Sequence, residues 1–231
     1  MVQLVAIAIP TLKLGVEQAS NPQQVSVFLQ VLLLLTVLSI APALLLMLTS
    51  FTRLIVVFSI LRHAMGLQAT PPNQVLISLA LFLTFFIMGP VFMQAYEEGL
   101  KPYMERKIDE KALFEKVTTP LKEFMLKNTR EKDLALFVKL RGESRPATPE
   151  DVSLLTLIPA FMISELKTAF QIGFLLYIPF LIIDLVVSTV LISMGILMLP
   201  PMMLSLPLKL LLFILVDGWN LLIFSLVKSF H

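Results

Sequence analysis

Cysteine is absent from this 231-residue chain, and histidine occurs only twice. Without cysteine the chain can form no disulfide, no thiolate nucleophile and no cysteine-based metal site. The two histidines, His63 and His231, lie far apart in the sequence and lack the spacing of metal ligands. Glycine-rich phosphate loops and serine nucleophile motifs are also missing. These absences predict a protein that is not an enzyme and that holds no metal or other cofactor.

Acidic residues stand next to one another at Glu97-Glu98, Asp109-Glu110 and Glu150-Asp151. Adjacent residues point to different faces of a helix, so these pairs favour solvated helix ends over a catalytic pair of carboxylates. The net charge of +2 is small. No stripe of lysine and arginine with interleaved aromatic residues is present, so no nucleic-acid partner is expected.

Charge is missing altogether from residues 18–52 and 63–96. Of the 18 basic and 16 acidic residues, 13 of each kind fall within residues 97–167. An uncharged apolar run of about 20 residues can cross the ~30 Å hydrocarbon core of a bilayer as a helix. With a mean hydropathy of +0.89, the chain is therefore predicted to be a membrane protein with one water-facing insert.

Four apolar helical regions are expected, and each contains a proline, with Pro179 dividing the third region into two helical pieces. Proline removes a backbone hydrogen bond and kinks a helix, so the regions are predicted to be bent or hairpin-like. The predicted fold is an all-α membrane protein. Its apolar regions cover about 25–48, 73–96, 154–199 and 202–229. Its parts are an N-terminal arm or weak export signal (1–24), N-terminal apolar helices (25–96), a hydrophilic helical insert (97–153) and C-terminal apolar helices (154–231).

Within the insert, apolar residues recur every three or four positions between lysines and glutamates. This period predicts two amphipathic helices, over about 109–127 and 129–140. The short connection before the second apolar region carries Arg53 and Arg62 and no acid. By the positive-inside rule this connection is predicted to lie in the cytoplasm, which makes the insert extracytoplasmic.

Two opposite charges, Glu165 and Lys167, lie in the apolar third region. Residues two apart on a helix point in different directions, so these two cannot pair with each other. Each needs a partner on another helix or another subunit, unless both lie at the water boundary with their charged ends in solvent. Nearby small residues such as Ala169 and Gly173 allow helices to approach closely in lipid.

Asp184 and Asp217 are further charges with apolar residues on both sides. Lys209 and Lys228 are the available cations, and Lys209 precedes Asp217 by about two helical turns. Ionisable groups inside such segments are costly and have assigned partners. The pattern favours contacts between helices or subunits over a proton relay.

Four methionines, Met194, Met198, Met202 and Met203, flank Pro200-Pro201. Unbranched thioethers are soft and can repack around varied surfaces. Such a group at a hairpin could seal a pore and still yield to a moving polypeptide. The other reading, which composition alone favours, is core filling at a helix–turn–helix.

Several ordered motifs between residues 25 and 230 resemble the FliP family of flagellar biosynthetic proteins, which has paralogues in injectisomes. In the N-terminal half the resemblance rests on Leu48-Thr-Ser-Phe-Thr-Arg53, Pro71-Pro-Asn-Gln74 and Thr129-Arg-Glu-Lys-Asp-Leu-Ala-Leu-Phe137. The more specific motifs lie in the C-terminal half. These are Pro159-Ala-Phe-Met-Ile-Ser-Glu-Leu-Lys-Thr-Ala-Phe-Gln-Ile-Gly-Phe174, Pro179-Phe-Leu-Ile-Ile-Asp184, Leu199-Pro-Pro201 and Val216-Asp-Gly-Trp219.

The resemblance implies a core subunit of the type III protein export gate in the bacterial inner membrane, within the flagellar basal body. It implies a pentamer that assembles with FliQ and FliR, alongside FlhA and FlhB, and passes unfolded flagellar proteins. The family's methionine gasket matches the loop Gly195–Pro201, where Ile196 and Leu197 stand at positions that often carry methionine in relatives and Met198 is the one match. The resemblance also implies that Glu165 and Lys167 lie at subunit interfaces. Asp184, Lys209 and Asp217 are further candidates for such charges.

Three alternatives stay open beside a pore subunit of the flagellar gate. One is the injectisome paralogue of the same family. Another is a small-solute transporter, which would predict converging polar groups and often an internal repeat, neither of which the sequence contains. The last is an assembly scaffold whose helical insert binds a basal-body ring.

Overall fold

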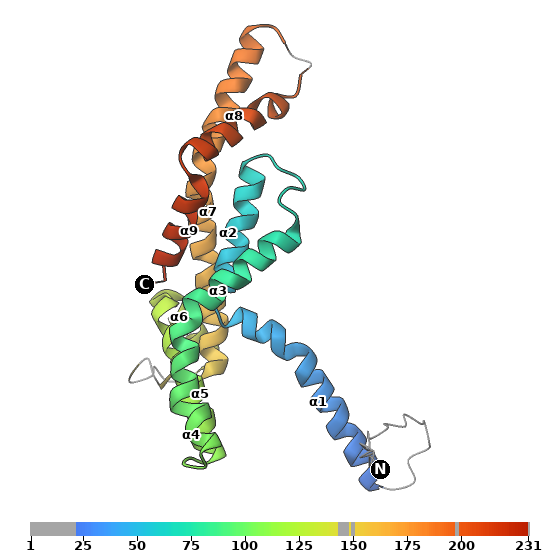
Figure 1. Cartoon of the computed structure of the whole chain (residues 1–231), viewed down its shortest axis with the longest axis vertical. Coiled ribbons are helices and arrows are strands. Elements are labelled where there is room, and N and C mark those ends of the chain that lie inside the picture. The colour runs from blue at the N-terminus through green and yellow to red at the C-terminus, as the bar shows by residue number, and fades with distance from the viewer. Residues whose placement is uncertain (1–21, 143–147, 149–150, 197–198, 231) are drawn as a thin grey trace, which may run out of the picture. The chain divides into compact units, whose positions relative to one another are not determined.

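The computed structural model describes residues 22–142, 148, 151–196 and 199–230, and within these ranges every regular element is a helix (Figure 1). The chain divides into two compact units, Met1–Pro42 and Ala43–His231. The prediction of an all-α membrane fold is confirmed. The predicted N-terminal arm lies mostly outside the described residues.

Unit 1 is described from Pro22, where helix α1 (Pro22–Met47) begins; the unit ends within this helix, at Pro42. The stretch Leu29–Ile40 is apolar, and its leucine, valine and isoleucine side chains are exposed. The hydroxyls of Thr36 and Ser39 donate to backbone carbonyls four residues earlier, each at 2.8 Å. This stretch therefore carries no unpaired hydroxyl, which suits a helix surrounded by lipid.

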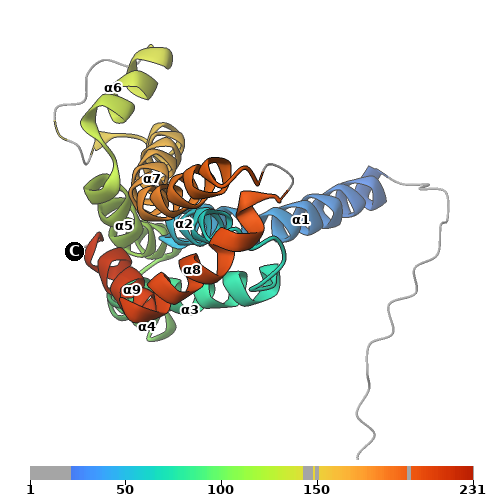
Figure 2. The same ribbon diagram turned by 90° about the horizontal axis from the view of Figure 1, so that it is seen from above.

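Helix α2 (Phe51–Ala64) was not predicted as an element of its own. Its apolar side chains recur at helical spacing and are buried at Leu54, Val57, Phe58, Leu61 and Ala64. It lies between α3 and α7 in the centre of unit 2 (Figure 2). The helix therefore forms the middle of the fold and is not a surface connection.

Helix α3 (Asn73–Ala95) continues through a π-helical turn, η1 (Tyr96–Leu100), into the short helix α4 (Lys101–Met104). The predicted apolar region 73–96 matches α3. Together Asn73–Met104 is long and apolar enough to cross a membrane. Pro90 lies inside α3 and does not end it.

The insert contains α5 (Glu110–Asn128) and α6 (Glu131–Leu140), close to the two amphipathic helices predicted. Asp109 caps α5, because its carboxylate accepts from the amide of Ala112 at 2.9 Å. Both helices pack against the N-terminal part of α7. A small second core, made of Met125, Val152, Leu157 and Phe161, holds this end of the unit together.

Helix α7 (Leu154–Ser193) is a single helix of 40 residues. The prediction that Pro179 divides this region is wrong: both Pro159 and Pro179 lie inside the continuous helix. A proline costs one hydrogen bond, and the flanking turns of this apolar segment keep helical geometry across it. Helix α7 is the second segment able to cross a membrane.

The last apolar region forms two helices, α8 (Pro201–Leu215) and α9 (Gly218–Lys228), joined at an angle of 64°. Pro207 lies inside α8, and the bend falls at Asp217, whose φ of 50° is left-handed. A left-handed residue cannot continue a right-handed helix. The pair counts as a third span only if the two helices cross together.

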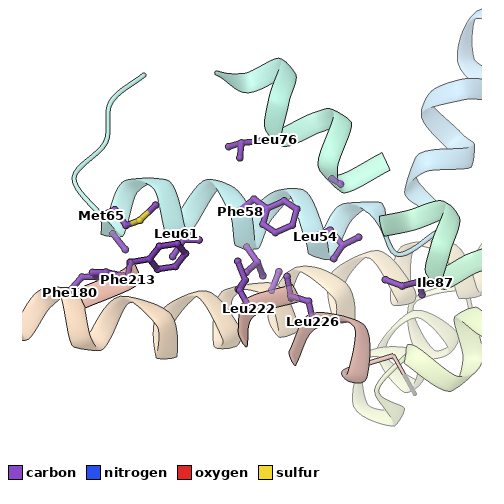
Figure 3. Close-up of a cluster of buried hydrophobic side chains, with 14 of the residues drawn as sticks. Leu54, Phe58, Leu61, Met65, Leu76, Ile87, Phe180, Phe213, Leu222 and Leu226 are labelled. Carbon is purple, nitrogen blue, oxygen red and sulfur yellow. The ribbon is translucent and has the colours of Figure 1, made fainter. Parts of the chain in front are cut away.

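The main core gathers side chains from α2, α3, α7, α8 and α9 (Figure 3). Phe58 and Leu61 of α2, with Met65 directly after it, face the C-terminal helices at Phe180, Phe213, Leu222 and Leu226. Trp219 lies edge-on to Phe213, with ring centroids 5.5 Å apart. This core sets α2 firmly against α7, and thereby positions the polar groups described next.

Candidate functional site

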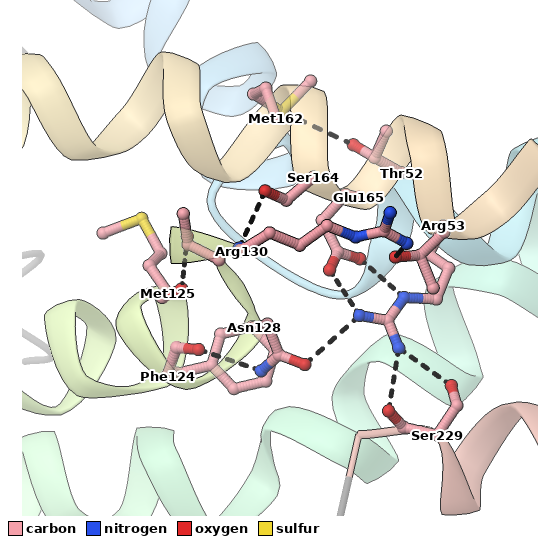
Figure 4. A network of polar contacts seen from close by, with 12 residues as sticks. Thr52, Arg53, Phe124, Met125, Asn128, Arg130, Met162, Ser164, Glu165 and Ser229 are labelled. Carbon is pink, nitrogen blue, oxygen red and sulfur yellow. Dashed lines mark hydrogen bonds and ion pairs between the residues drawn. The ribbon is translucent and has the colours of Figure 1, made fainter. Parts of the chain in front are cut away.

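Arg53 on α2 lies at the centre of a buried polar cluster that draws on four segments (Figure 4). Its side chain is 3% exposed, and that of its partner Glu165 on α7 is 0% exposed. Nε donates to one Glu165 oxygen at 2.9 Å, and Nη2 donates to the other. A guanidinium offers its donors in a fixed fork that suits such a bidentate carboxylate.

The remaining donors of Arg53 are also used. Nη2 donates to Asn128 Oδ1 at 3.2 Å, at the end of α5. Nη1 donates to both the carbonyl and the hydroxyl of Ser229, at 2.9 and 2.8 Å. All five N–H groups of the guanidinium therefore have an acceptor, which is the condition for burying this cation. We call Arg53, Asn128, Glu165, Ser229 and Phe230 the arginine site.

Aromatic rings close the arginine site on one side. The guanidinium carbon of Arg53 lies 3.7 Å from the centroid of the Phe230 ring. Phe230 in turn stacks on Phe124 of α5, with centroids 6.1 Å apart and planes 20° apart. A cation over an aromatic face is stabilised, and more so where water is excluded.

Lys167 has a partner in the insert: its ammonium bonds to Asp133 of α6. Ser164 Oγ donates to the same carboxylate at 2.9 Å and accepts from the backbone amide of Arg130 at 3.0 Å. Two of the sequence motifs thus meet in space, Thr129–Phe137 and Pro159–Phe174. Arg130 and Asp133 of the first motif bond to Ser164, Lys167, Thr168 and Gln171 of the second.

The pKa of Asp133 is held below its usual range, chiefly by the hydrogen bond from Lys167; Ser164 adds to this against the opposing effect of burial. A lowered pKa means that the carboxylate stabilises the fold above the ordinary aspartate pKa of about 3.9 and loses that effect as pH falls below it.

Asp133→Asn is expected to lower the unfolding free energy by about 1–2 kcal/mol at pH 7. Thermal unfolding of both proteins in detergent measures the difference. It should be constant from about pH 5 to 8 and shrink below about pH 4; a difference unchanged in acid contradicts the ion pair.

Lys209 lies on α8 and is buried, and its ammonium reaches two other helices. It donates to Asp184 of α7 at 2.6 Å and to the carbonyl of Ala64, the last residue of α2, at 3.1 Å. Ser205 donates to the other Asp184 oxygen at 2.6 Å. Lys209 therefore fastens α8 to α2 and α7.

Asp217 does not pair with Lys209, the available cation about two helical turns earlier, which bonds to Asp184 instead. It is exposed at the bend between α8 and α9, and no partner for its carboxylate is found among the described residues. The flanking side chains of Leu215 and Val216 are exposed and apolar. Of the acidic groups named in the C-terminal apolar helices, Asp217 is the one without a side-chain partner in the part of the chain that the structure describes.

The turn between α7 and α8 carries the candidate pore residues. Helix α7 ends with a Schellman motif, in which Gly195 takes a φ of 74° and the amide of Ile196 bonds to the carbonyl of Leu191 at 3.0 Å. Leu197 and Met198 lie outside the described residues. Met194, Leu199, Met202 and Met203 are exposed, Met203 to 72%. Methionines on the described part of this hairpin are thus a surface and not a core.

A shallow hollow of about 350 Å³ lies beside the hairpin. Its walls come from the α2–α3 loop and from the start of α8: Gly66, Leu67, Gln68, Ala69, Thr70, Pro200, Met202, Met203 and Leu206. The α2–α3 loop therefore lies beside the start of α8, across this hollow. Arg62 braces this loop, donating to Pro71 O at 3.2 Å and to Asn73 Oδ1 at 2.6 Å.

The contact between Arg53 and Asn128 limits which predicted membrane sides can be right. The sequence placed Arg53 on the cytoplasmic side and the insert on the other side. Arg53 lies within 3.2 Å of Asn128, which belongs to the insert. No membrane separates these two residues, so at most one of the two side assignments can hold. On which side of the membrane Arg53 and the insert lie together stays a prediction.

The arrangement holds helices together and presents an apolar hairpin. Among the described residues there is no group of three or more histidine, aspartate or glutamate side chains that could hold a metal ion. Asn128, Ser229 and Phe230 could not be expected in a site, because neither spacing nor charge distinguishes them in the sequence. A lone arginine inside the apolar face of a helix was the signal that could have marked Arg53.

Comparison with known proteins gives a consistent family. Residues 34–226 match the model of the FliP family. The flagellar biosynthetic protein FliP of Bacillus subtilis strain 168 is 54% identical over 217 residues, which cover 94% of this chain and 98% of that protein. The protein of the same name from Aquifex aeolicus is 51% identical over 205 residues, 88% of this chain and 86% of that one. The FliP protein of Pectobacterium carotovorum is 54% identical over 202 residues, which cover 87% of this chain and 78% of that protein.

Proposed function

Since the chain belongs to the FliP family of flagellar biosynthetic proteins, we propose that it is a pore-forming subunit of the flagellar type III protein export gate. It is a membrane protein and not an enzyme, as its sequence predicted. The proposal places it in the bacterial inner membrane, in the flagellar basal body. There it passes unfolded flagellar proteins across the membrane.

The observation that carries the proposal is the exposed hairpin between α7 and α8. It exposes the apolar side chains of Leu199 and of the flexible methionines Met194, Met202 and Met203, and none of them is buried in the chain's own core. A ring of such side chains from several copies could close a pore to ions and still repack around a moving chain. Ile196, Leu197 and Met198 belong to the same proposed gate.

The proposed assembly is a homo-oligomer, a pentamer by family resemblance, with FliQ and FliR as partners and FlhA and FlhB beside it. Exposed apolar side chains along α7, among them Phe170, Phe174 and Leu181, offer it a broad surface for other helices. The argument for an interface charge is most direct for Asp217, because its carboxylate has no partner among the described residues of its own chain.

Glu165, Lys167, Asp184 and Lys209 are proposed interface charges as well. Each already has a partner on another helix of the same chain. A role between subunits therefore requires that the assembly shares or exchanges these pairs. Within the single chain they already hold α2, α6, α7 and α8 in the arrangement that presents the hairpin.

Native mass spectrometry of the chain co-expressed with FliQ and FliR tests the proposal. A discrete complex in mild detergent that contains several copies of this chain is the expected result. A monomer that binds neither partner would contradict the pore-subunit proposal and favour a scaffold or transporter. Binding to injectisome counterparts of FliQ and FliR, with none to the flagellar proteins, would identify the injectisome paralogue instead.

A further inference from the structure

Helix α9 and the turn that follows it, Gly218–Phe230, form a segment that we call the α9 strap. We infer that this strap closes over the buried Arg53–Glu165 pair and opens as a unit, independently of the rest of unit 2. The inference does not depend on the proposed pore role. It rests on how the strap is attached at its two ends and along its inner face.

The far end of the strap is held by Arg53. Ser229 caps α9, and its carbonyl is one of the groups that a helix end leaves without an intrahelical donor. Arg53 Nη1 supplies that donor at 2.9 Å, together with a bond to the Ser229 hydroxyl at 2.8 Å. A cation at a helix C-terminus is also favoured by the helix dipole. The contact therefore stabilises the strap and the arginine together.

Phe230 adds an aromatic contact at the same end. Its ring contacts both the guanidinium of Arg53 and the ring of Phe124, and it is 5% exposed. Loss of the strap would leave Arg53 with two donors unbonded and one face uncovered. The closed state is favoured because nothing else in the chain serves those two donors among the described contacts.

Only one side of the strap is packed. Leu222 and Leu226 are buried in the main core, at 3% and 0% exposure, whereas Leu221 and Phe224 on the other side are exposed. A helix that is packed on one side can leave by giving up that single interface. Such locally separable segments are a general feature of folded proteins.

The near end of the strap is already bent. Asp217 has left helical geometry, with a φ of 50°, and α8 meets α9 at 64°. Opening at this point therefore breaks no helix. Helix α8 is held separately, through Lys209 to Asp184 and Ala64, so it can stay in place while α9 moves.

The chain's lack of cysteine allows a direct test with single-cysteine reporters. Leu226→Cys reports on the inner face of the strap, and Leu157→Cys reports on the second core at the base of α7; both leucines are fully buried. The rate of maleimide labelling in detergent is measured for each reporter in the otherwise unchanged full chain. It is then measured with Phe230→Ala and, as the control, with Lys228→Ala, which changes an exposed neighbour.

Phe230→Ala is expected to raise the labelling rate at position 226 by about tenfold or more, through loss of the stack and the cation contact. The rate at position 157 should stay within about twofold, and Lys228→Ala should change neither. Ser229→Ala is a milder second variant, should Phe230→Ala not fold, and is expected to act only at 226. If both reporters accelerate together, unit 2 opens as a whole and the inference is wrong. An unchanged rate at 226 would also overturn it.

Discussion

Replacing Arg53 with alanine is expected to lower the free energy of unfolding of unit 2 by about 3–5 kcal/mol, enough to prevent stable folding. The cause is the carboxylate of Glu165, which is 0% exposed and would be left buried without a counter-charge. Asn128 and Ser229 would lose their donor as well. Thermal unfolding in detergent, or the yield of folded protein where unfolding is irreversible, measures the loss.

Arg62→Ala is the matched control, because it removes an arginine from the same helix. The partners of Arg62 are uncharged: the carbonyl of Pro71 and the side-chain amide of Asn73 at the start of α3. Its effect should be smaller by several-fold. Adding Glu165→Gln to Arg53→Ala should recover part of the stability, since the unpaired charge is then gone. An Arg53→Ala protein as stable as the Arg62→Ala protein would show that the arginine site is not a structural centre.

Gly173→Ala is expected to lower the free energy of unfolding, because the added methyl group forces α2 and α7 apart. The loss should lie at the upper end of the range of about 1–3 kcal/mol typical of overpacking. A Cβ at Gly173 would lie 2.4 Å from Ile60 Cδ1 and 3.1 Å from Ile60 Cβ. The end of the Ile60 side chain could move, but its Cβ is fixed on α2, and a branched side chain has few other rotamers in a helix. The thermal unfolding midpoint measures the cost.

Gly89→Ala provides the control within an apolar helix, because a Cβ there meets no atom within 4 Å. It should leave stability unchanged or raise it by up to about 1 kcal/mol, since alanine favours helices more than glycine does. Equal effects of the two substitutions would mean that the close approach of α2 and α7 does not depend on the missing side chain.

The helices that the sequence predicted well are those with a clear period or a long apolar run. Helices α3, α5 and α6 have observed bounds within a few residues of the predicted ones. Helix α2 was missed because its two arginines and the polar residues before it suggested a connection. Its 14 residues are too few for a membrane span, and its role as the centre of the core depends on helices far away in the sequence.

The sequence showed which charged residues cannot pair with each other, but not which residues they pair with instead. Two-residue spacing shows that Glu165 and Lys167 cannot pair with each other, and each indeed bonds to another helix. The partners could not be predicted, because Arg53 and Glu165 are 112 positions apart. The bend between α8 and α9 falls at Asp217, and composition does not reveal its left-handed backbone conformation.

Cross-linking at the hairpin tests the central claim most directly, namely that several copies of this chain bring their hairpins together around a pore. Met203→Cys places the only cysteine of the chain at an exposed hairpin position, and Phe114→Cys places it at an exposed position on the insert as a control. In the complex with FliQ and FliR, a short bifunctional maleimide should join copies through position 203 and not through position 114. A complex that contains several copies but yields no link at 203 would contradict the account, because the hairpins would then lie apart.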